Sequence, residues 1–183
     1  AIVFICKKEN NTMGIMYCGI DLSISSTGLA VVEYLGNGKF KLIDKKTISP
    51  PRTPKNPFDR KVESLRLFQF ANESLTPYRE SKFFVFENYS FGSPGKITEL
   101  AELAGIYKFY INTALNKPFD FIAPQSVKKI ITGNGRSDKL QVKIGLNNFI
   151  ENSSDFIFNN YDESDAAAVA VAYGIKMEQE KLD

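Results

Sequence analysis

The first fifty residues carry the apolar patterns of β-strands. Residues 15–20 form a short apolar run that ends on Asp21, which predicts a buried strand with an acid at its C-terminal edge. Residues 27–35 read as a second strand and residues 39–48 as a third, and a Gly-Asn-Gly turn signal separates them. The pattern therefore predicts an antiparallel meander of three strands.

Helices and strands alternate in the rest of the chain, after the Pro-rich stretch SPPRTPKNP ends the meander. Apolar residues at helical intervals predict an amphipathic helix over residues 58–78, and they are Val62, Leu65, Phe68 and Leu75. The elements predicted next are strands at 82–87 and 119–123, helices at 96–116, 124–131 and 138–150, and a helix from about residue 162. This order predicts an α/β fold with a five-stranded mixed sheet and helices on both faces.

Length and composition place these elements in one domain. A chain of 183 residues with 43% hydrophobic residues suits a single buried core, expected over residues 13–183. Residues 1–12 read as an extension without an assigned role, because Met13 looks like an alternative start. No apolar run approaches the roughly 18 residues of a membrane span, and the opening lacks the pattern of a signal peptide. We expect a cytoplasmic protein without membrane partners, with Cys6 and Cys18 as free thiols.

The chain contains no histidine, which narrows the possible chemistry. Imidazole bases, Ser/His/Asp triads and zinc motifs that include His are excluded, and two cysteines cannot form an all-Cys zinc site. Oxygen atoms must hold any metal, which favours Mg²⁺ or Mn²⁺. The formal net charge of +2 does not by itself indicate a nucleic-acid binder.

Four acids lie at the ends of predicted elements. Asp21 and Glu87 end strands, whereas Asp162 and Asp165 open the last helix. Singly, such acids are usually turn residues or helix caps. Asp162 and Asp165 share one helix face, however, and the small residues of AAAVAVAYG allow that helix to approach the sheet. We therefore expect the four carboxylates to converge on one or two divalent ions, since two ions about 4 Å apart can drive phosphodiester hydrolysis.

Four blocks of the sequence resemble, in order and spacing, those of RuvC-type Holliday junction resolvases in the ribonuclease H-like superfamily. They are CGIDLSISSTGLAVV, FFVFENYSF, IAPQSVKKIITGNGRSDKLQV and DESDAAAVAVAYG. The resemblance covers about residues 16–174 and implies a ribonuclease H-like fold and a crossover junction endodeoxyribonuclease. The implied partners are branched DNA, four-way junctions above all, and a second copy of the chain. Two symmetric nicks would leave 5′-phosphate and 3′-hydroxyl ends.

The resemblance also assigns roles to individual residues. The implied Mg²⁺-binding catalytic acids are Asp21, Glu87, Asp162 and Asp165, with two ions per site and Mn²⁺ as a substitute. Lys139 is implied to contact the scissile phosphate, and no nucleotide cofactor is implied. Where bacterial members usually have Pro-Gly after the first Asp, this chain has Leu22-Ser23. It is therefore more similar to phage-type members, which leaves sequence preference open.

Two segments are candidates for DNA contacts. A Gly-rich loop is flanked by five basic residues, Lys128, Lys129, Arg136, Lys139 and Lys143, which favours phosphate binding over an ordinary solvated helix face. The loop that carries Tyr89, Phe91 and Lys96 is a candidate for probing unstacked bases at a branch point. In the bacterial relatives an aromatic inserts at the junction centre, and Tyr89 or Phe91 is its counterpart here. The alternative is that Phe91 anchors this loop in the core.

The helix predicted at 96–116 carries more apolar surface than one sheet face requires. With Gly105 allowing close approach, it could form a two-fold interface, or it could simply pack in the core.

Three other functions remain open from the sequence. The segment GIDLSISSTG also resembles the phosphate-binding hairpin of actin-like and sugar-kinase ATPases, although these use two such domains. A nuclease for flaps, forks or RNA–DNA hybrids would have the same active site. A catalytically silent DNA-binding module is disfavoured because all four acids are present.

Overall fold

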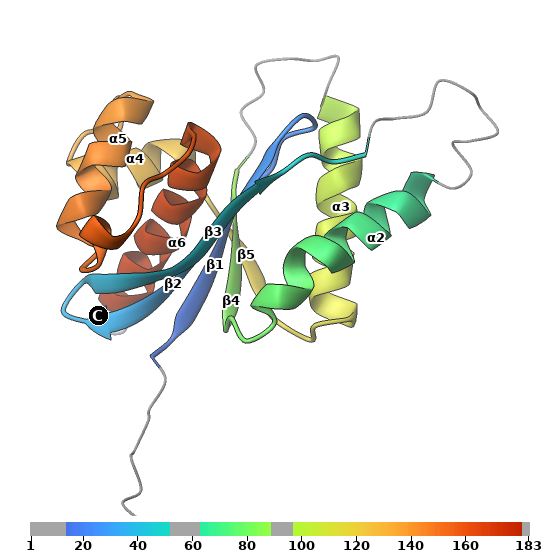
Figure 1. Ribbon diagram of the computed structural model, residues 1–183, viewed down its shortest axis with the longest axis horizontal. Coiled ribbons are helices and arrows are strands. Elements are labelled where there is room, and N and C mark those ends of the chain that lie inside the picture. Colours follow the sequence, from blue (N-terminus) through green and yellow to red (C-terminus); the bar gives the residue numbers. More distant parts are fainter. Residues whose placement is uncertain (1–13, 52–62, 89–96, 181–183) are drawn as a thin grey trace, which may run out of the picture.

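The computed structural model describes residues 14–51, 63–88 and 97–180, and its five strands form one mixed sheet (Figure 1). The strands are β1 (Met16–Asp21), β2 (Thr27–Gly36), β3 (Lys39–Ile48), β4 (Phe83–Glu87) and β5 (Phe119–Ile122). Their order in the sheet is β3-β2-β1-β4-β5. β2 pairs antiparallel with β1 and β3, whereas β4 pairs parallel with β1 and β5. The predicted α/β class and mixed sheet are confirmed.

Helices cover both faces of this sheet (Figure 1). α2 (Glu63–Leu75) and α3 (Ile97–Thr113) lie on one face. α4 (Pro124–Thr132), α5 (Lys139–Gly145) and α6 (Tyr161–Gln179) lie on the other. Short 3₁₀ turns are formed by Thr76–Tyr78, Leu146–Asn148 and Ser153–Asp155.

Local sequence signals account for several element ends. Gly36, Asn37 and Gly38 all have positive φ, at 98°, 53° and 69°, so the predicted tight turn between β2 and β3 is present. Pro124 occupies the first turn of α4, and Gly133 ends that helix with a left-handed φ of 81°.

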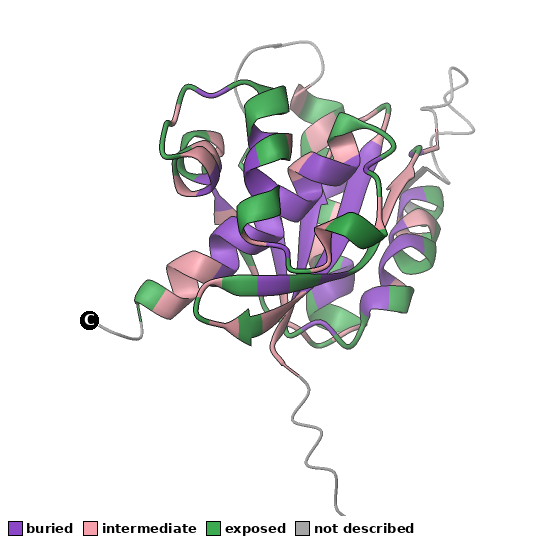
Figure 2. Ribbon diagram, turned by 60° about the vertical axis from the view of Figure 1, so that its left-hand side comes forward, coloured by how far each residue is buried: buried purple, intermediate pink, exposed green. Residues whose placement is uncertain are grey.

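α6 is the central helix of the larger core. Its segment from Ala166 to Gly174 is buried throughout, as the purple ribbon in Figure 2 shows. It packs against Tyr17 and Ala30 of the sheet and against Val127 and Val142 from α4 and α5. The opposite face has a separate core in which strand residues such as Phe84 pack against α2 and α3. Within the described ranges, no helix is long and apolar enough to cross a membrane.

Two details of the predicted helices are wrong. The helix expected over 138–150 ends at Gly145, and the chain continues only as the 3₁₀ turn Leu146–Asn148. Leu146 in this turn and Ile150 after it are both buried in the core. Leu65, assigned to the apolar face of α2, is 69% exposed, because α2 contacts the sheet through Leu67, Ala71 and Leu75 instead.

Candidate active site

The ends of β1 and β4 bring Asp21 and Glu87 to one edge of the sheet. The two strands are parallel neighbours, and Ile20 lies opposite Phe86 in the register. Side chains alternate between the two faces of a strand. Because Ile20 and Phe86 belong to the core under α2 and α3, Asp21 and Glu87 point to the opposite face, toward α6.

α6 brings the other two acids to the same edge, because glycines in the sheet let it approach closely. A Cβ at Gly19 would lie 2.0 Å from the Ala166 carbonyl oxygen, and one at Gly28 would lie 2.1 Å from that of Asp162. Any side chain at either glycine would push the helix outward. The first turn of α6, which carries Asp162, therefore lies directly on β2, and Asp165 follows one turn further along the helix.

Three of the four predicted acids line one cavity of about 290 Å³, and they are Asp21, Glu87 and Asp165. Lys128 and Lys139 line it as well, and Pro124, Val127, Val142 and Ala168 supply its apolar walls. Asp162 is not part of the lining, because its Oδ2 accepts a hydrogen bond from Ser26 Oγ on the β1–β2 connection. The structure thus brings three acids into one cavity and holds the fourth beside it.

The pKa values of the strand-end acids show how strongly the site disfavours uncompensated negative charge. Burial first, and then the charges of Asp165 and Asp162, raise the pKa of Asp21 from its ordinary value of 3.8 to about 6, although Lys139 acts to lower it. Burial first, and then the charges of Asp21 and Asp165, likewise raise the pKa of Glu87 from 4.5 to about 7. The four acids are therefore electrostatically coupled.

Lys139 is the cation that meets this cluster. It opens α5, where Asp138 caps the helix by accepting a hydrogen bond from the Gln141 N–H at 2.8 Å. Its Nζ lies 2.6 Å from Asp165 Oδ2. Burial acts to lower the pKa of Lys139, but the hydrogen bond with Asp165 and the surrounding carboxylates outweigh it and raise that pKa.

The donor set fits a hard divalent cation in type and charge. All of the acids offer carboxylate oxygens, which Mg²⁺ and Mn²⁺ prefer. The raised pKa values of Asp21 and Glu87 show that these two lack sufficient compensating positive charge. In the part of the chain that the structure describes, no three acidic or cysteine side chains lie in positions that could hold one ion together. The Lys139 ammonium pairs with Asp165 and shares the cavity with Asp21 and Glu87.

The predicted DNA-contact residues are distributed unequally around this cavity. Lys128 and Lys139 line it, whereas Lys129 and Arg136 are exposed on α4 and on the loop after it. Lys143 donates a hydrogen bond from Nζ to the Phe158 carbonyl oxygen at 3.2 Å, so its ammonium points away from the acids toward a neighbouring groove. Tyr89, Phe91 and Lys96 lie outside the described residues.

Three residues that the sequence did not single out contact the first turn of α6. Ser26 donates to Asp162, as described above, and Lys45 on β3 forms an ion pair with Glu163 at 2.6 Å. Burial acts to raise the pKa of Glu163, but hydrogen bonds from Lys45 and Asn159 outweigh it and lower that pKa. Ser26 and Lys45 each lie more than a hundred positions from the acid that they contact, so no local motif could reveal them.

Comparison with known proteins identifies the family. The family described as "Crossover junction endodeoxyribonuclease RuvC" matches residues 17–173. The enzyme of that name from Ehrlichia ruminantium (strain Welgevonden) is 30% identical over 165 residues, which cover 86% of this chain and 96% of the relative.

Two solved structures share the fold. Thermus thermophilus RuvC in complex with Holliday junction substrate has a TM-score of 0.73 at 19% identity, covering 91% of this chain and 96% of that one. The yeast mitochondrial Holliday junction resolvase Ydc2 has a TM-score of 0.62 at 15% identity, covering 90% and 80%. The sheet, with acids at the ends of its two central parallel strands, thus defines a nuclease of the ribonuclease H-like fold. More specifically, the chain belongs to the RuvC family of crossover junction endodeoxyribonucleases.

Proposed function

We propose that this chain resolves four-way DNA junctions by hydrolysing one phosphodiester bond at each of two symmetric positions, leaving 5′-phosphate and 3′-hydroxyl ends. The observation that carries the proposal is the cavity that acids from β1, β4 and α6 line together with Lys139, which pairs with Asp165. The Thermus relative was solved with a Holliday junction substrate, which supports the same substrate class here.

Mg²⁺ is the proposed cofactor, with Mn²⁺ as a substitute. The family is one of metal-dependent nucleases, and Asp21, Glu87 and Asp165 would hold the ions, with Asp162 beside them. Bound divalent ions in such a site supply water activation and stabilise the charge that develops on the leaving oxygen.

The chain's own residues perform the remaining tasks. The Lys139 ammonium, which meets Asp165 in this structure, can instead neutralise a non-bridging oxygen of the scissile phosphate. Lys128 lines the same cavity and can hold the neighbouring phosphate. The apolar walls from Val127 and Val142 limit bulk water around these groups.

The proposed functional unit is a homodimer formed through the outer surface of α3 and α2. Phe109 is 57% exposed and Leu65 is 69% exposed, and the ring of Phe68 lies between their helices, 6.3 Å from the Phe109 ring. Gly105 is exposed on the same helix, and a Cβ there would contact nothing within 4 Å. This apolar surface suits a second copy, which would supply the second nick.

Asp165→Asn is the decisive variant for the proposed chemistry. It removes one cavity carboxylate and leaves a side chain of the same shape, so junction cleavage with Mg²⁺ should fall by at least ~10²-fold while junction binding persists. Cleavage of four-way, flap, fork and linear duplex DNA by the wild type defines the substrate. Comparable cutting of all four DNAs would contradict junction specificity, and undiminished cutting by the variant would refute the assigned site.

A further inference from the structure

Glu163 lies between the two aspartates of α6 in sequence, but its carboxylate pairs with Lys45 on β3. Its side chain is only 5% exposed, and both carboxylate oxygens are occupied. Oε2 accepts from Lys45 Nζ at 2.6 Å and from the Asn159 N–H at 2.9 Å, while Oε1 accepts from Asn159 Nδ2 at 3.0 Å. Glu163 therefore has no free oxygen to offer the cavity.

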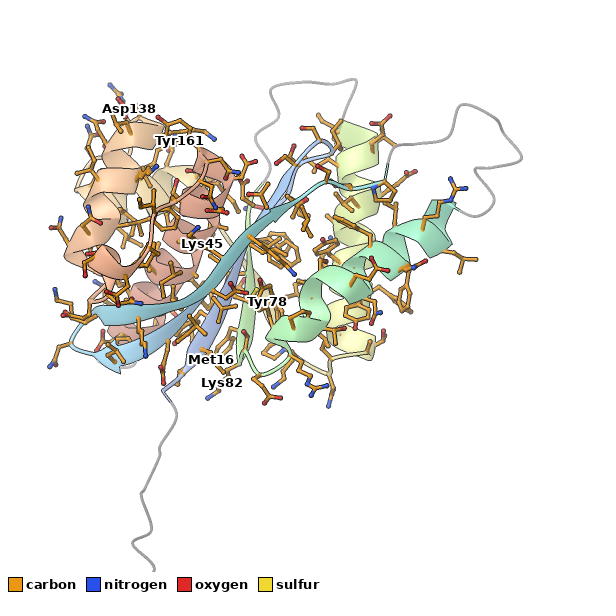
Figure 3. All side chains as sticks on the ribbon, viewed as in Figure 1. Met16, Lys45, Tyr78, Lys82, Asp138 and Tyr161 are labelled. Atoms are coloured by element: carbon orange, nitrogen blue, oxygen red, sulfur yellow. The ribbon has the colours of Figure 1, made fainter. Side chains whose placement is uncertain are left out.

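Lys45 reaches Glu163 from β3, the edge strand that β2 and β1 separate from β4. Its side chain is 13% exposed, and its Nζ also lies 5.8 Å from the centroid of the Phe158 ring. Figure 3 labels Lys45 on the strand, at the side of the sheet that faces the α6 layer. Because Glu163 belongs to the first turn of α6, this contact joins the strand to the turn that carries Asp162 and Asp165.

Further contacts fix the same turn from neighbouring positions. Asn160 Oδ1 caps α6 by accepting from the Glu163 N–H at 3.0 Å, and Thr47 Oγ1 donates to that same oxygen at 3.0 Å. Thr47 and Lys45 are two positions apart on β3, so their side chains share a face. Thr47 pairs in register with Gly28, the glycine that contacts the Asp162 backbone.

Buried ion pairs seldom add much stability, because the cost of taking two charges out of water offsets their attraction. A pair that is fully hydrogen-bonded does, however, impose one geometry on the elements that it joins. Metal sites depend on such outer contacts, whose loss commonly weakens metal affinity or activity by about 10- to 100-fold.

We propose that the Lys45–Glu163 pair positions the two aspartates of α6 for cation binding, without itself contacting cation or DNA. The inference rests on the proposed function, since it assigns Asp162 and Asp165 to the cation site. Without the pair, the first turn of α6 would keep its cap and its contacts with Thr47 and Gly28, but it would be held less firmly in its orientation toward Asp21 and Glu87.

The test uses Lys45→Met, Lys45→Arg and the double variant Lys45→Met/Glu163→Gln. Lys45→Met leaves a buried carboxylate unpaired and can fail to fold, whereas the double variant leaves no unpaired charge and should keep a near-native melting temperature. Lys39→Met is the matched control, because Lys39 lies on the same strand but forms an exposed pair with Glu151 at 3.3 Å.

Three measurements are made on each variant: hydrogen exchange of the metal-free protein, Mn²⁺ affinity by calorimetry, and junction cleavage. In the double variant we expect faster exchange at residues 162–165 but not at 168–172, Mn²⁺ affinity weaker by about tenfold or more, and kcat lower with KM within about twofold. Lys45→Arg should recover most of the affinity, and Lys39→Met should match the wild type.

A double variant that binds Mn²⁺ and cleaves like the wild type would overturn the inference and leave the proposed function intact. A wild type that neither binds Mn²⁺ nor cleaves junctions would overturn both.

Discussion

At the scale of single residues, the cavity keeps two carboxylates that are unfavourable to ionise. Asp21 and Glu87 are charged in the unfolded chain above about pH 4.5, yet their pKa values in the fold are about 6 and about 7. Between about pH 4.5 and pH 7 the native state binds more protons than the unfolded state, so the free energy of unfolding must fall as pH rises. The same repulsion favours binding of a divalent cation, so the site sacrifices stability for function.

The pH dependence of stability tests this directly. Without divalent ions at pH 7.5, Asp21→Asn and Glu87→Gln should each raise the free energy of unfolding by about 2–3 kcal/mol and therefore raise the melting temperature above that of the wild type. This advantage should vanish near pH 4. Thermal melts in chelator between pH 4 and 8 measure the difference. Glu73→Gln, at an exposed position on α2, is the control. A variant advantage that does not change with pH would contradict the assigned cause.

At the scale of elements, periodicity located the strands and the acids at their ends. The apolar runs ending at Asp21 and Glu87 placed both acids at the correct edge, and the three-residue spacing of Asp162 and Asp165 placed them on one helix. The sequence could not show that Asp162 turns toward Ser26, because that hydrogen bond joins positions 136 apart. Nor could periodicity show which face of α2 meets the sheet, and Leu65 was assigned wrongly for that reason.

The site depends on the close approach of α6 to the sheet. Two glycine substitutions distinguish the loss of this approach from the general effect of adding a methyl group. Gly28→Ala would place a methyl group 2.1 Å from the Asp162 carbonyl oxygen, so the first turn of α6 must shift. We expect the free energy of unfolding to fall by about 2–3 kcal/mol. The Mg²⁺ concentration required for cleavage should rise by about tenfold.

Gly105→Ala is the matched control, since its Cβ would meet nothing and it lies within α3. It should stabilise the chain by about 0.5–1 kcal/mol. Because Gly105 also lies on the proposed two-fold surface, this control is read on Mn²⁺ affinity, a property of the cavity within one chain, which should not change. Chemical denaturation and Mg²⁺ titration of cleavage measure both effects. An unchanged Mg²⁺ requirement in a folded Gly28→Ala protein would show that the close approach of α6 is dispensable.

At the scale of the whole molecule, the proposed paired cutting must be reconciled with the acid-lined cavity, of which the described part of the chain holds one. A single site can make only one nick at a time, and an unpaired nick leaves the junction unresolved. The cavity opens at the edge formed by the ends of β1 and β4, whereas Phe109 and Leu65 lie on the outer surface of the helices that cover the opposite face. Two copies joined through that surface would leave both cavities free for DNA.

Phe109→Lys tests this arrangement, because a charge in the middle of an apolar interface costs several kcal/mol when it is left unpaired. We expect the wild type to sediment as a dimer at micromolar concentration and the variant as a monomer, while the fold and Mn²⁺ affinity of the variant are unchanged. On a supercoiled plasmid that extrudes a cruciform, paired cutting gives linear DNA and unpaired cutting gives nicked circles, so the variant should accumulate nicked circles. Gln179→Lys places the same charge at an exposed polar position near the end of α6, on the other face of the sheet, and should behave as the wild type. Phe109→Lys protein that remains dimeric and still linearises the plasmid would place the two-fold interface elsewhere on the molecule.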